Sequence, residues 1–185
     1  MRALIALSLT LLFTTAGADN HNNTLQRVAE TGQFRIGFVP DAPPLSFFDG
    51  NGNAAGYSID LCRHIASTVR NELGLEKIDI TYTPLVSMEE RLGAIEDGEV
   101  DIECGATTVT LSRRERVDFT LMTFITGSAV LSRKANPLGG IDDLDGVKIA
   151  VLSGTTTEDV MRKVIEVNEF DVELVLIDAH DEGMD

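Results

Sequence analysis

The sequence predicts an α/β fold built around a mainly parallel sheet, and three observations lead to that prediction. Short segments rich in β-branched and aromatic residues alternate with segments whose apolar residues recur at helical spacing. Loops rich in proline, glycine or hydroxyl residues follow the strand-like segments, where α/β proteins bind their ligands. The alternation occurs on both sides of an extended stretch at residues 121–132, so we expect two αβ units.

The first unit opens with a helix and a strand. Residues 24–31 form a short predicted helix that Gly32 ends. Residues 34–39 predict a strand, because large apolar residues alternate there with Arg35 and a glycine. A proline-rich loop, residues 40–44, follows at the C-terminal end of this strand.

A hairpin and the clearest helix come next. Residues 46–48 lead into a turn of glycine and asparagine at residues 49–53, which predicts a hairpin. Residues 57–73 predict an amphipathic helix with Gly74 as its C-cap. The apolar stripe of this helix consists of Ile59, Cys62, Ile65, Ala66, Val69 and Leu73.

The first unit closes with a strand, a helix and a second strand. Residues 78–83 are β-branched and predict a strand. Residues 87–97 form a second amphipathic helix that ends at Gly98, and residues 100–103 form a short strand.

The second unit contains one βαβ pattern. A turn of helix at residues 141–145 precedes a strand at residues 148–152, a helix from about residue 158 to 167 and a strand at residues 172–177. One such pattern is too small to form a core of its own. We therefore expect either a truncated second unit or one that packs on another body.

The N-terminus has the features of an export signal. Residues 1–18 carry an early arginine, an apolar run and an A-x-A cleavage site, which predicts a secretory signal peptide, and residues 19–23 predict a disordered leader. No later segment is apolar enough to cross a bilayer. The net charge of −15 argues against binding to nucleic acid or anionic lipid.

The cysteines and histidines give little sign of metal chemistry. Cys62 and Cys104 form either one disulfide in an oxidising compartment or two buried thiols. His21, His64 and His180 are scattered without ligand spacing, so we expect no metal and no cofactor.

An arginine-rich stretch at residues 103–120 is the first candidate site. Ser112 and Glu115 fit a capping box, which places Arg113 in the first turn of a helix. Backbone N–H groups and hydroxyls just upstream add hydrogen-bond donors, from Ala106, Thr107 and Thr108. Such donors beside a forked guanidinium suit a small carboxylate. The alternative is an arginine-rich surface helix.

A second candidate turn lies at residues 153–157, SGTTT, before the helix of the second unit. Its hydroxyls and N–H groups stand at a helix N-terminus and suit an anion. It lacks the second glycine and the lysine of a nucleotide-binding P-loop. The alternative is an ordinary N-cap. Two such turns, one in each unit, suggest two walls that close on one anionic group.

Four motifs carry a resemblance to a known family. They are GYSIDLCRHIA at residues 56–66, VDIECGATT at 100–108, RRERVDFT at 113–120 and LSGTTTE at 152–158. The chain resembles the family 3 extracellular solute-binding proteins, the polar amino-acid receptors of ABC importers, and is most similar to the glutamate/aspartate-binding branch. Ser58 departs from the pattern, since an acidic residue is usual there.

The resemblance implies a two-lobe fold of the type II periplasmic binding proteins, with an amino acid trapped between the lobes. Residues 24–122 correspond to a nearly complete lobe 1, residues 123–127 to a hinge strand and residues 128–185 to a partial lobe 2. The part of the family fold that supplies an acidic residue for the ligand ammonium, and the return to lobe 1, is expected to be missing.

The resemblance also implies a ligand site. Arg113 pairs with the ligand α-carboxylate, and Ala106 and Thr108 add contacts from lobe 1. Lobe 2 contributes Gly154, Thr155 and Thr156, and Tyr57 lines the side-chain pocket. Val39 stands where the acidic-ligand branch carries an arginine, so a neutral polar ligand and an acidic one both stay open.

The function that follows is a monomeric periplasmic receptor that delivers a polar or acidic L-amino acid to an ABC permease in the inner membrane. A ligand-sensing domain of a membrane receptor is one alternative. A dehydratase-like enzyme on the same fold is another, but the sequence contains no nucleophile–base constellation. Asp101 and Glu103 alternate on a strand and indicate framework or rim residues.

Overall fold

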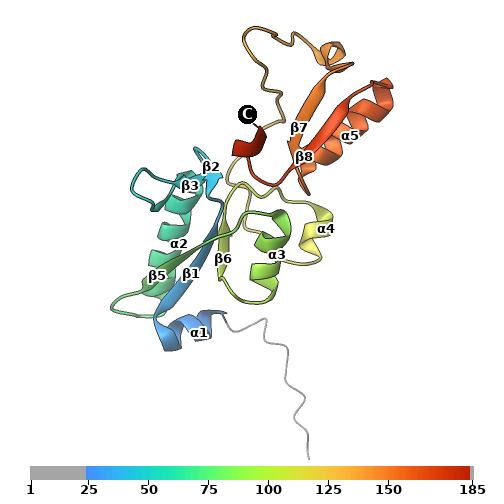
Figure 1. The fold of residues 1–185 in the computed structure, drawn as a ribbon. Coiled ribbons are helices and arrows are strands. Elements are labelled where there is room, and N and C mark those ends of the chain that lie inside the picture. Colours follow the sequence, from blue (N-terminus) through green and yellow to red (C-terminus); the bar gives the residue numbers. More distant parts are fainter. Residues whose placement is uncertain (1–23, 184–185) are drawn as a thin grey trace, which may run out of the picture.

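The computed structural model describes residues 24–183, and the predicted signal peptide and leader lie outside this range. Figure 1 shows two αβ units joined by a long connection. The first unit contains α1 (Thr24–Thr31), β1 (Gln33–Phe38), β2 (Asp41–Ala42), β3 (Ser46–Phe48), β4 (Ala54–Ala55), α2 (Tyr57–Glu72), β5 (Asp79–Pro84), α3 (Met88–Glu96), β6 (Ile102–Cys104) and α4 (Leu111–Arg114). The second contains η2 (Ile141–Leu144), β7 (Lys148–Leu152), α5 (Thr156–Asn168), β8 (Glu173–Ile177) and η3 (Asp181–Gly183).

The central sheet of the first unit is parallel, as the sequence predicts. Its strand order is β5-β1-β6, and β1 pairs in parallel with both neighbours. A separate antiparallel sheet, β2-β3-β4, contains the predicted hairpin. The Asp49 carboxylate fixes its turn by accepting the backbone N–H groups of Asn51 and Asn53, each at 2.8 Å.

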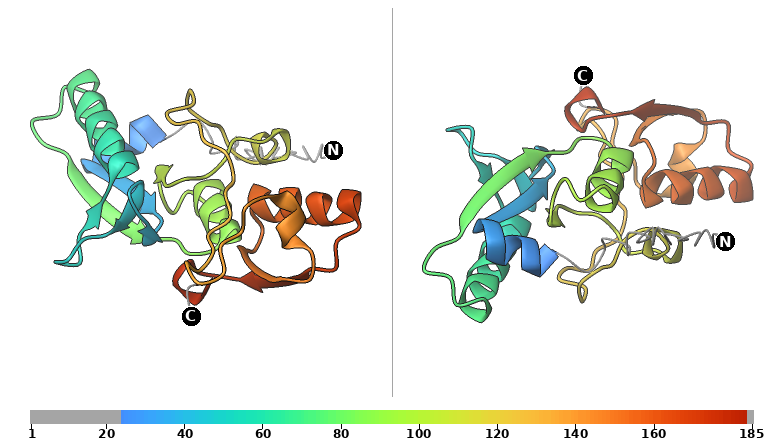
Figure 2. Two further views of the ribbon diagram at one scale, coloured as in Figure 1. Left: turned by 90° about the horizontal axis from the view of Figure 1, so that it is seen from above. Right: turned by 90° about the horizontal axis from the view of Figure 1, so that it is seen from below.

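Helices cover both faces of the parallel sheet (Figure 2). The large side chains of β1 at alternate positions form one core with the predicted stripe of α2 and with Val28 of α1. The opposite face packs against α3, and Gly37 of β1 lies there. A Cβ on Gly37 would come within 2.5 Å of a Leu85 side-chain atom and 3.2 Å of one from Val100, so a larger residue would displace these side chains.

The second unit is a βαβ pattern with a two-stranded parallel sheet. β7 pairs with β8 from Lys148 opposite Glu173 to Leu152 opposite Ile177, and α5 packs on β7. Within residues 24–183, none of the helices has the length and apolar character needed to cross a bilayer.

The connection between the units, residues 121–132, is called the crossing segment below. The predicted strand at residues 123–127 is wrong, because the crossing segment has no strand assignment, and its role as a hinge stays a prediction. A strand needs a neighbour for its ladder of hydrogen bonds. No strand of the described residues pairs with this segment.

Candidate functional site

The short helix α4 places Arg113 between the two units. Its N-cap is Thr110, whose hydroxyl accepts the Arg113 backbone N–H at 3.2 Å. The predicted capping box of Ser112 and Glu115 is therefore wrong, since Glu115 stands at the C-cap. Arg113 nevertheless lies in the first turn, as predicted, because Thr110 stands only two residues before the predicted cap Ser112.

The Arg113 guanidinium bridges the two units. Its side chain is buried, with 8% of the residue surface exposed. Nη1 donates to the carbonyl of Thr108 at 2.7 Å, and Nη2 donates to the carbonyl of Gly154 in the second unit at 3.1 Å. These two bonds use two of the five N–H donors of the guanidinium. Among the contacts of the described residues, the other three N–H groups are left for an anion.

The surroundings of Arg113 make its positive charge costly. Burial lowers the pKa of Arg113, and the neighbouring cation Arg91 lowers it further. The carboxylates of Asp159 and Glu103 act in the opposite direction. An anionic ligand would relieve the repulsion between the two guanidiniums.

The turn after β7 forms the facing wall. Gly154 has φ +68°, which glycine adopts without strain, and its N–H donates to Glu158 Oε2 at 2.8 Å. Thr155 is the N-cap of α5, so its hydroxyl is engaged locally with the Glu158 N–H at 3.3 Å and the Leu152 carbonyl at 2.7 Å.

A second contact joins the two walls beside Arg113. The hydroxyls of Thr156 and Thr108 lie 3.4 Å apart. The structure therefore brings four of the eight predicted residues together at one contact between the units: Arg113, Thr108, Gly154 and Thr156.

Three predicted residues lie apart from this contact. Tyr57 donates its hydroxyl to the Thr123 carbonyl at 2.9 Å, and its ring lies tilted against that of Phe124 in the crossing segment, with centroids 6.3 Å apart. Ala106 is exposed. The Thr107 hydroxyl is buried without a hydrogen-bond partner among the described residues.

Arg91 is a charged residue that the sequence reasoning missed. It is 5% exposed, and its Nη2 donates to the Val86 carbonyl at 2.6 Å. Together with Val86–Glu89 it faces residues 152–155 and Asp178 across a cavity of about 120 Å³ between the units. A signal was available, because Arg91 lies three residues before Ala94 on the inward face of α3.

Comparison with protein families matches residues 34–179 to the bacterial extracellular solute-binding proteins, family 3. The chain belongs to this family. It is 31% identical over 179 residues to the L-glutamate/L-aspartate-binding protein of Pseudomonas aeruginosa, covering 96% of the chain and 59% of that relative. The glutamine-binding protein of Geobacillus stearothermophilus is 29% identical over 167 residues, covering 86% of the chain and 59% of the relative.

Solved structures of amino-acid-binding proteins share the fold of this solute-binding chain. An ancestral amino acid-binding protein, AncCDT-1, described as a precursor of cyclohexadienyl dehydratase, is 27% identical with a TM-score of 0.74, over 87% of this chain and 67% of that one. The arginine-bound form of truncated ArgBP from T. maritima is 25% identical with a TM-score of 0.70, over 86% and 70%. The fold is thus that of the type II periplasmic binding proteins. The chain spans about 59% of the length of the glutamate/aspartate-binding relatives of Pseudomonas aeruginosa and Salmonella typhimurium.

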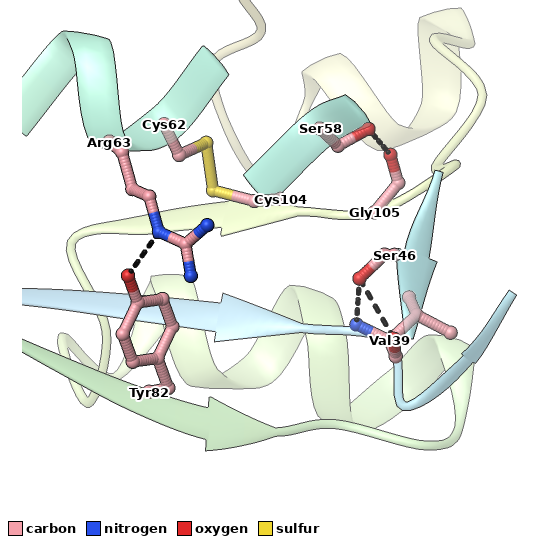
Figure 3. The surroundings of a disulfide bond; sticks show 8 residues. All are labelled: Val39, Ser46, Ser58, Cys62, Arg63, Tyr82, Cys104 and Gly105. Carbon is pink, nitrogen blue, oxygen red and sulfur yellow. Dashed lines mark hydrogen bonds between the residues drawn. A yellow bond between two sulfur atoms is a disulfide. The ribbon is translucent and has the colours of Figure 1, made fainter. Parts of the chain in front are cut away.

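The two cysteines of this family member form a disulfide between α2 and the end of β6 (Figure 3). Cys104 immediately precedes the loop at residues 105–108, and the Ser58 hydroxyl of α2 donates to the Gly105 carbonyl at 2.8 Å in the same region. Both links hold one end of this loop on α2. Within residues 24–183, no three metal-ligating side chains converge on one point.

Val39 does not take part in the cavity between the units. It is fully buried, and its backbone N–H and carbonyl both bond to the Ser46 hydroxyl, at 2.9 and 2.8 Å (Figure 3). Its side chain packs beside Gly105, where a Cβ would come within 2.5 Å of Val39 Cγ2. Val39 therefore adds nothing to this cavity, whose charged lining residues are Arg91, Glu89 and Asp178.

Proposed function

We propose that the chain supplies the ligand-capturing surfaces of a periplasmic solute-binding protein of an amino-acid ABC importer. The observation that carries the proposal is the buried Arg113 guanidinium held between the two units, on Thr108 on one side and Gly154 on the other. A bidentate guanidinium is the strongest common partner for a carboxylate. The ligand α-carboxylate is the group assigned to it.

Ligand entry changes the partners of Arg113. The Gly154 carbonyl is neutral, so its bond with Arg113 is weaker than the charge-assisted bonds that a carboxylate makes. A ligand carboxylate would replace Gly154 on Nη2 and also meet the hydroxyls of Thr108 and Thr156. Contacts made by both units to one ligand would shift the open–closed equilibrium toward closure.

The ligand is a polar or acidic L-amino acid, and Arg91 supports the acidic class. Its buried guanidinium lines the cavity beside Gly154 and Thr155, in reach of a second carboxylate. Burying such a charge is costly unless it is paired. The names of two relatives, which bind glutamate and aspartate, agree with the acidic class, and the glutamine-binding relative agrees with a neutral polar ligand.

The proposal includes location and partners. Residues 1–18 direct export to the periplasm, where the protein acts as a monomer, binds without turnover and delivers its ligand to an inner-membrane ABC permease. The family is bacterial and extracellular, and two of the relatives are named as glutamate/aspartate import proteins.

Calorimetric titration of the chain with the common L-amino acids tests the proposal. Saturable binding of one or a few polar or acidic amino acids, with each recovered unchanged, is the expected result. Conversion of an amino acid into a product would show an enzyme. An absence of saturable binding to every amino acid would reject the assignment.

A further inference from the structure

Three buried polar atoms around the loop at residues 105–108 have no hydrogen-bond partner among the described residues. They are Arg91 Nε on α3, Glu103 Oε1 on β6 and Thr107 Oγ1 in the loop. Arg91 and Thr107 both act on the Glu103 carboxylate, so the three side chains are neighbours. Buried polar atoms of folded proteins are almost always hydrogen-bonded, so three orphans at one place require an explanation.

The three atoms are chemically complementary. Arg91 Nε carries one N–H and is a donor only, the Glu103 carboxylate oxygen is an acceptor, and the Thr107 hydroxyl is both. The rest of the Arg91 side chain is held by the bond from Nη2 to the Val86 carbonyl at 2.6 Å, so Nε cannot swing toward another partner freely. A single water accepts one hydrogen bond and donates two, which fits these three groups.

Glu103 is held in place by its own strand and by Gly105. A Cβ on Gly105 would come within 2.3 Å of Glu103 Oε1, so the carboxylate lies against the bare backbone of the loop. The Thr107 hydroxyl and the Gly105 N–H lie close enough to lower the pKa of Glu103, but neither meets Oε1 in hydrogen-bond geometry. A bridging group is therefore needed to satisfy this oxygen.

We propose that Arg91 Nε, Glu103 Oε1 and Thr107 Oγ1 bind one buried water, and that Glu103 is thereby a positioning residue for Arg91 and for the loop at residues 105–108. The water links α3, which carries one buried guanidinium, to the loop whose Thr108 carbonyl holds the other. This inference concerns the protein without ligand and does not depend on which amino acid it binds.

The charges around Glu103 give the arrangement a pH dependence. Arg91 of α3 and Arg113 of α4 face its carboxylate, Asp41 of β2 faces Arg91, and Asp159 of α5 faces Arg113. Burial nevertheless raises the pKa of Glu103 above its ordinary value of 4.5. The folded state then binds the proton more tightly than the unfolded state, so Glu103 reduces stability as the pH rises from that value through its folded pKa.

Hydrogen exchange of the arginine Nε–H groups tests the water directly. In the ¹⁵N-labelled chain, the Nε–H of Arg91, assigned by its loss in Arg91→Lys, should exchange at least roughly tenfold more slowly than that of the exposed Arg114. A nuclear Overhauser contact from this proton to water, rather than to another side chain, is expected. Exchange as fast as that of Arg114 would overturn the proposal, whatever the variants do.

Substitutions separate positioning from simple packing. Glu103→Gln keeps an acceptor, so it should preserve the slow Arg91 exchange while removing the Glu103 contribution to the pH dependence of unfolding. Glu103→Ala and Thr107→Val should each speed that exchange roughly fivefold or more. Thr81→Val, at an exposed strand position, is the matched control and should leave it unchanged. If Glu103→Ala fails to fold, Thr107→Val decides, and unchanged exchange in that variant would contradict the proposal.

Discussion

At the scale of single residues, Asp101 shows how one buried carboxylate joins separate elements. Its side chain is 1% exposed and pairs with both Arg27 of α1 and Arg35 of β1, the latter at 2.9 Å. It also accepts the backbone N–H of Arg35 at 2.7 Å. The sequence-based interpretation of Asp101 as a framework residue agrees with these contacts.

Replacing Asp101 with asparagine should destabilise the fold. The substitution leaves two guanidiniums without their carboxylate. Each arginine side chain is 27% exposed and stays partly hydrated, so we expect the free energy of unfolding to fall by about 3 kcal/mol, the low end for broken buried pairs. Urea unfolding measures this. Asp79→Asn, in the exposed pair with Lys77, should change stability by less than about 0.5 kcal/mol. Equal effects of both variants would refute the role of Asp101.

Arg91 governs a second residue-scale prediction, on ligand choice. Arg91→Met fills similar space without the charge, so the affinity for glutamate should fall at least roughly tenfold while that for glutamine changes little. Paired calorimetric titrations with the two amino acids measure the ratio. An unchanged ratio would show that Arg91 does not face the ligand side chain.

At the scale of elements, the N-cap of α4 determines where Arg113 lies. Thr110 accepts the Arg113 N–H, so Thr110→Ala should destabilise the protein by about 1 kcal/mol and weaken amino-acid binding. Ser112→Ala is the control, because Ser112 is not the cap and should stay within about 0.5 kcal/mol of the parent. Thermal unfolding and amino-acid titration of both variants measure these effects. A larger loss of stability in Ser112→Ala than in Thr110→Ala would show that Ser112 is the N-cap and contradict the assignment of Thr110.

Elements with a complete local pattern could be predicted from the sequence. α1 and β7 have the predicted bounds, and α2 ends one residue earlier than predicted, with Leu73 as its C-cap and Gly74 following at φ +65°. The parallel sheet and the apolar stripe of α2 were also predicted. In each case the alternation, stripe or glycine lies within the element itself.

Features that depend on distant partners could not be predicted in the same way. Thr110 and Ser112 both carry a hydroxyl, and only the backbone geometry of the loop selects Thr110 as the cap. The proposed role of Arg91 arises from a cavity between α3 and the β7–α5 turn, which no local pattern encodes. The crossing segment has an extended composition but no neighbouring strand, so it forms no ladder.

At the scale of the whole molecule, a local positive site lies in an acidic protein. The net charge is −15, yet Arg91 and Arg113 stand buried near each other at the contact between the units. The overall field repels anions, so capture depends on the short-range, desolvated bonds of this contact. The two units meet at this contact through the bond from Arg113 to Gly154. They meet at a second place, where the backbone N–H of His180 donates to the Asp41 carboxylate at 2.7 Å.

Calorimetric titration of Arg113→Ala, beside Arg113→Lys and the exposed control Arg114→Ala, tests the assignment of Arg113 as the carboxylate anchor. Arg113→Ala should lose about 2–5 kcal/mol of amino-acid binding free energy because the ligand carboxylate loses its buried partner. That loss is roughly 30-fold to several-thousand-fold in affinity. Arg113→Lys should recover part of it, and Arg114→Ala should bind like the parent. Binding of the same amino acid by Arg113→Ala with unchanged affinity would contradict the account.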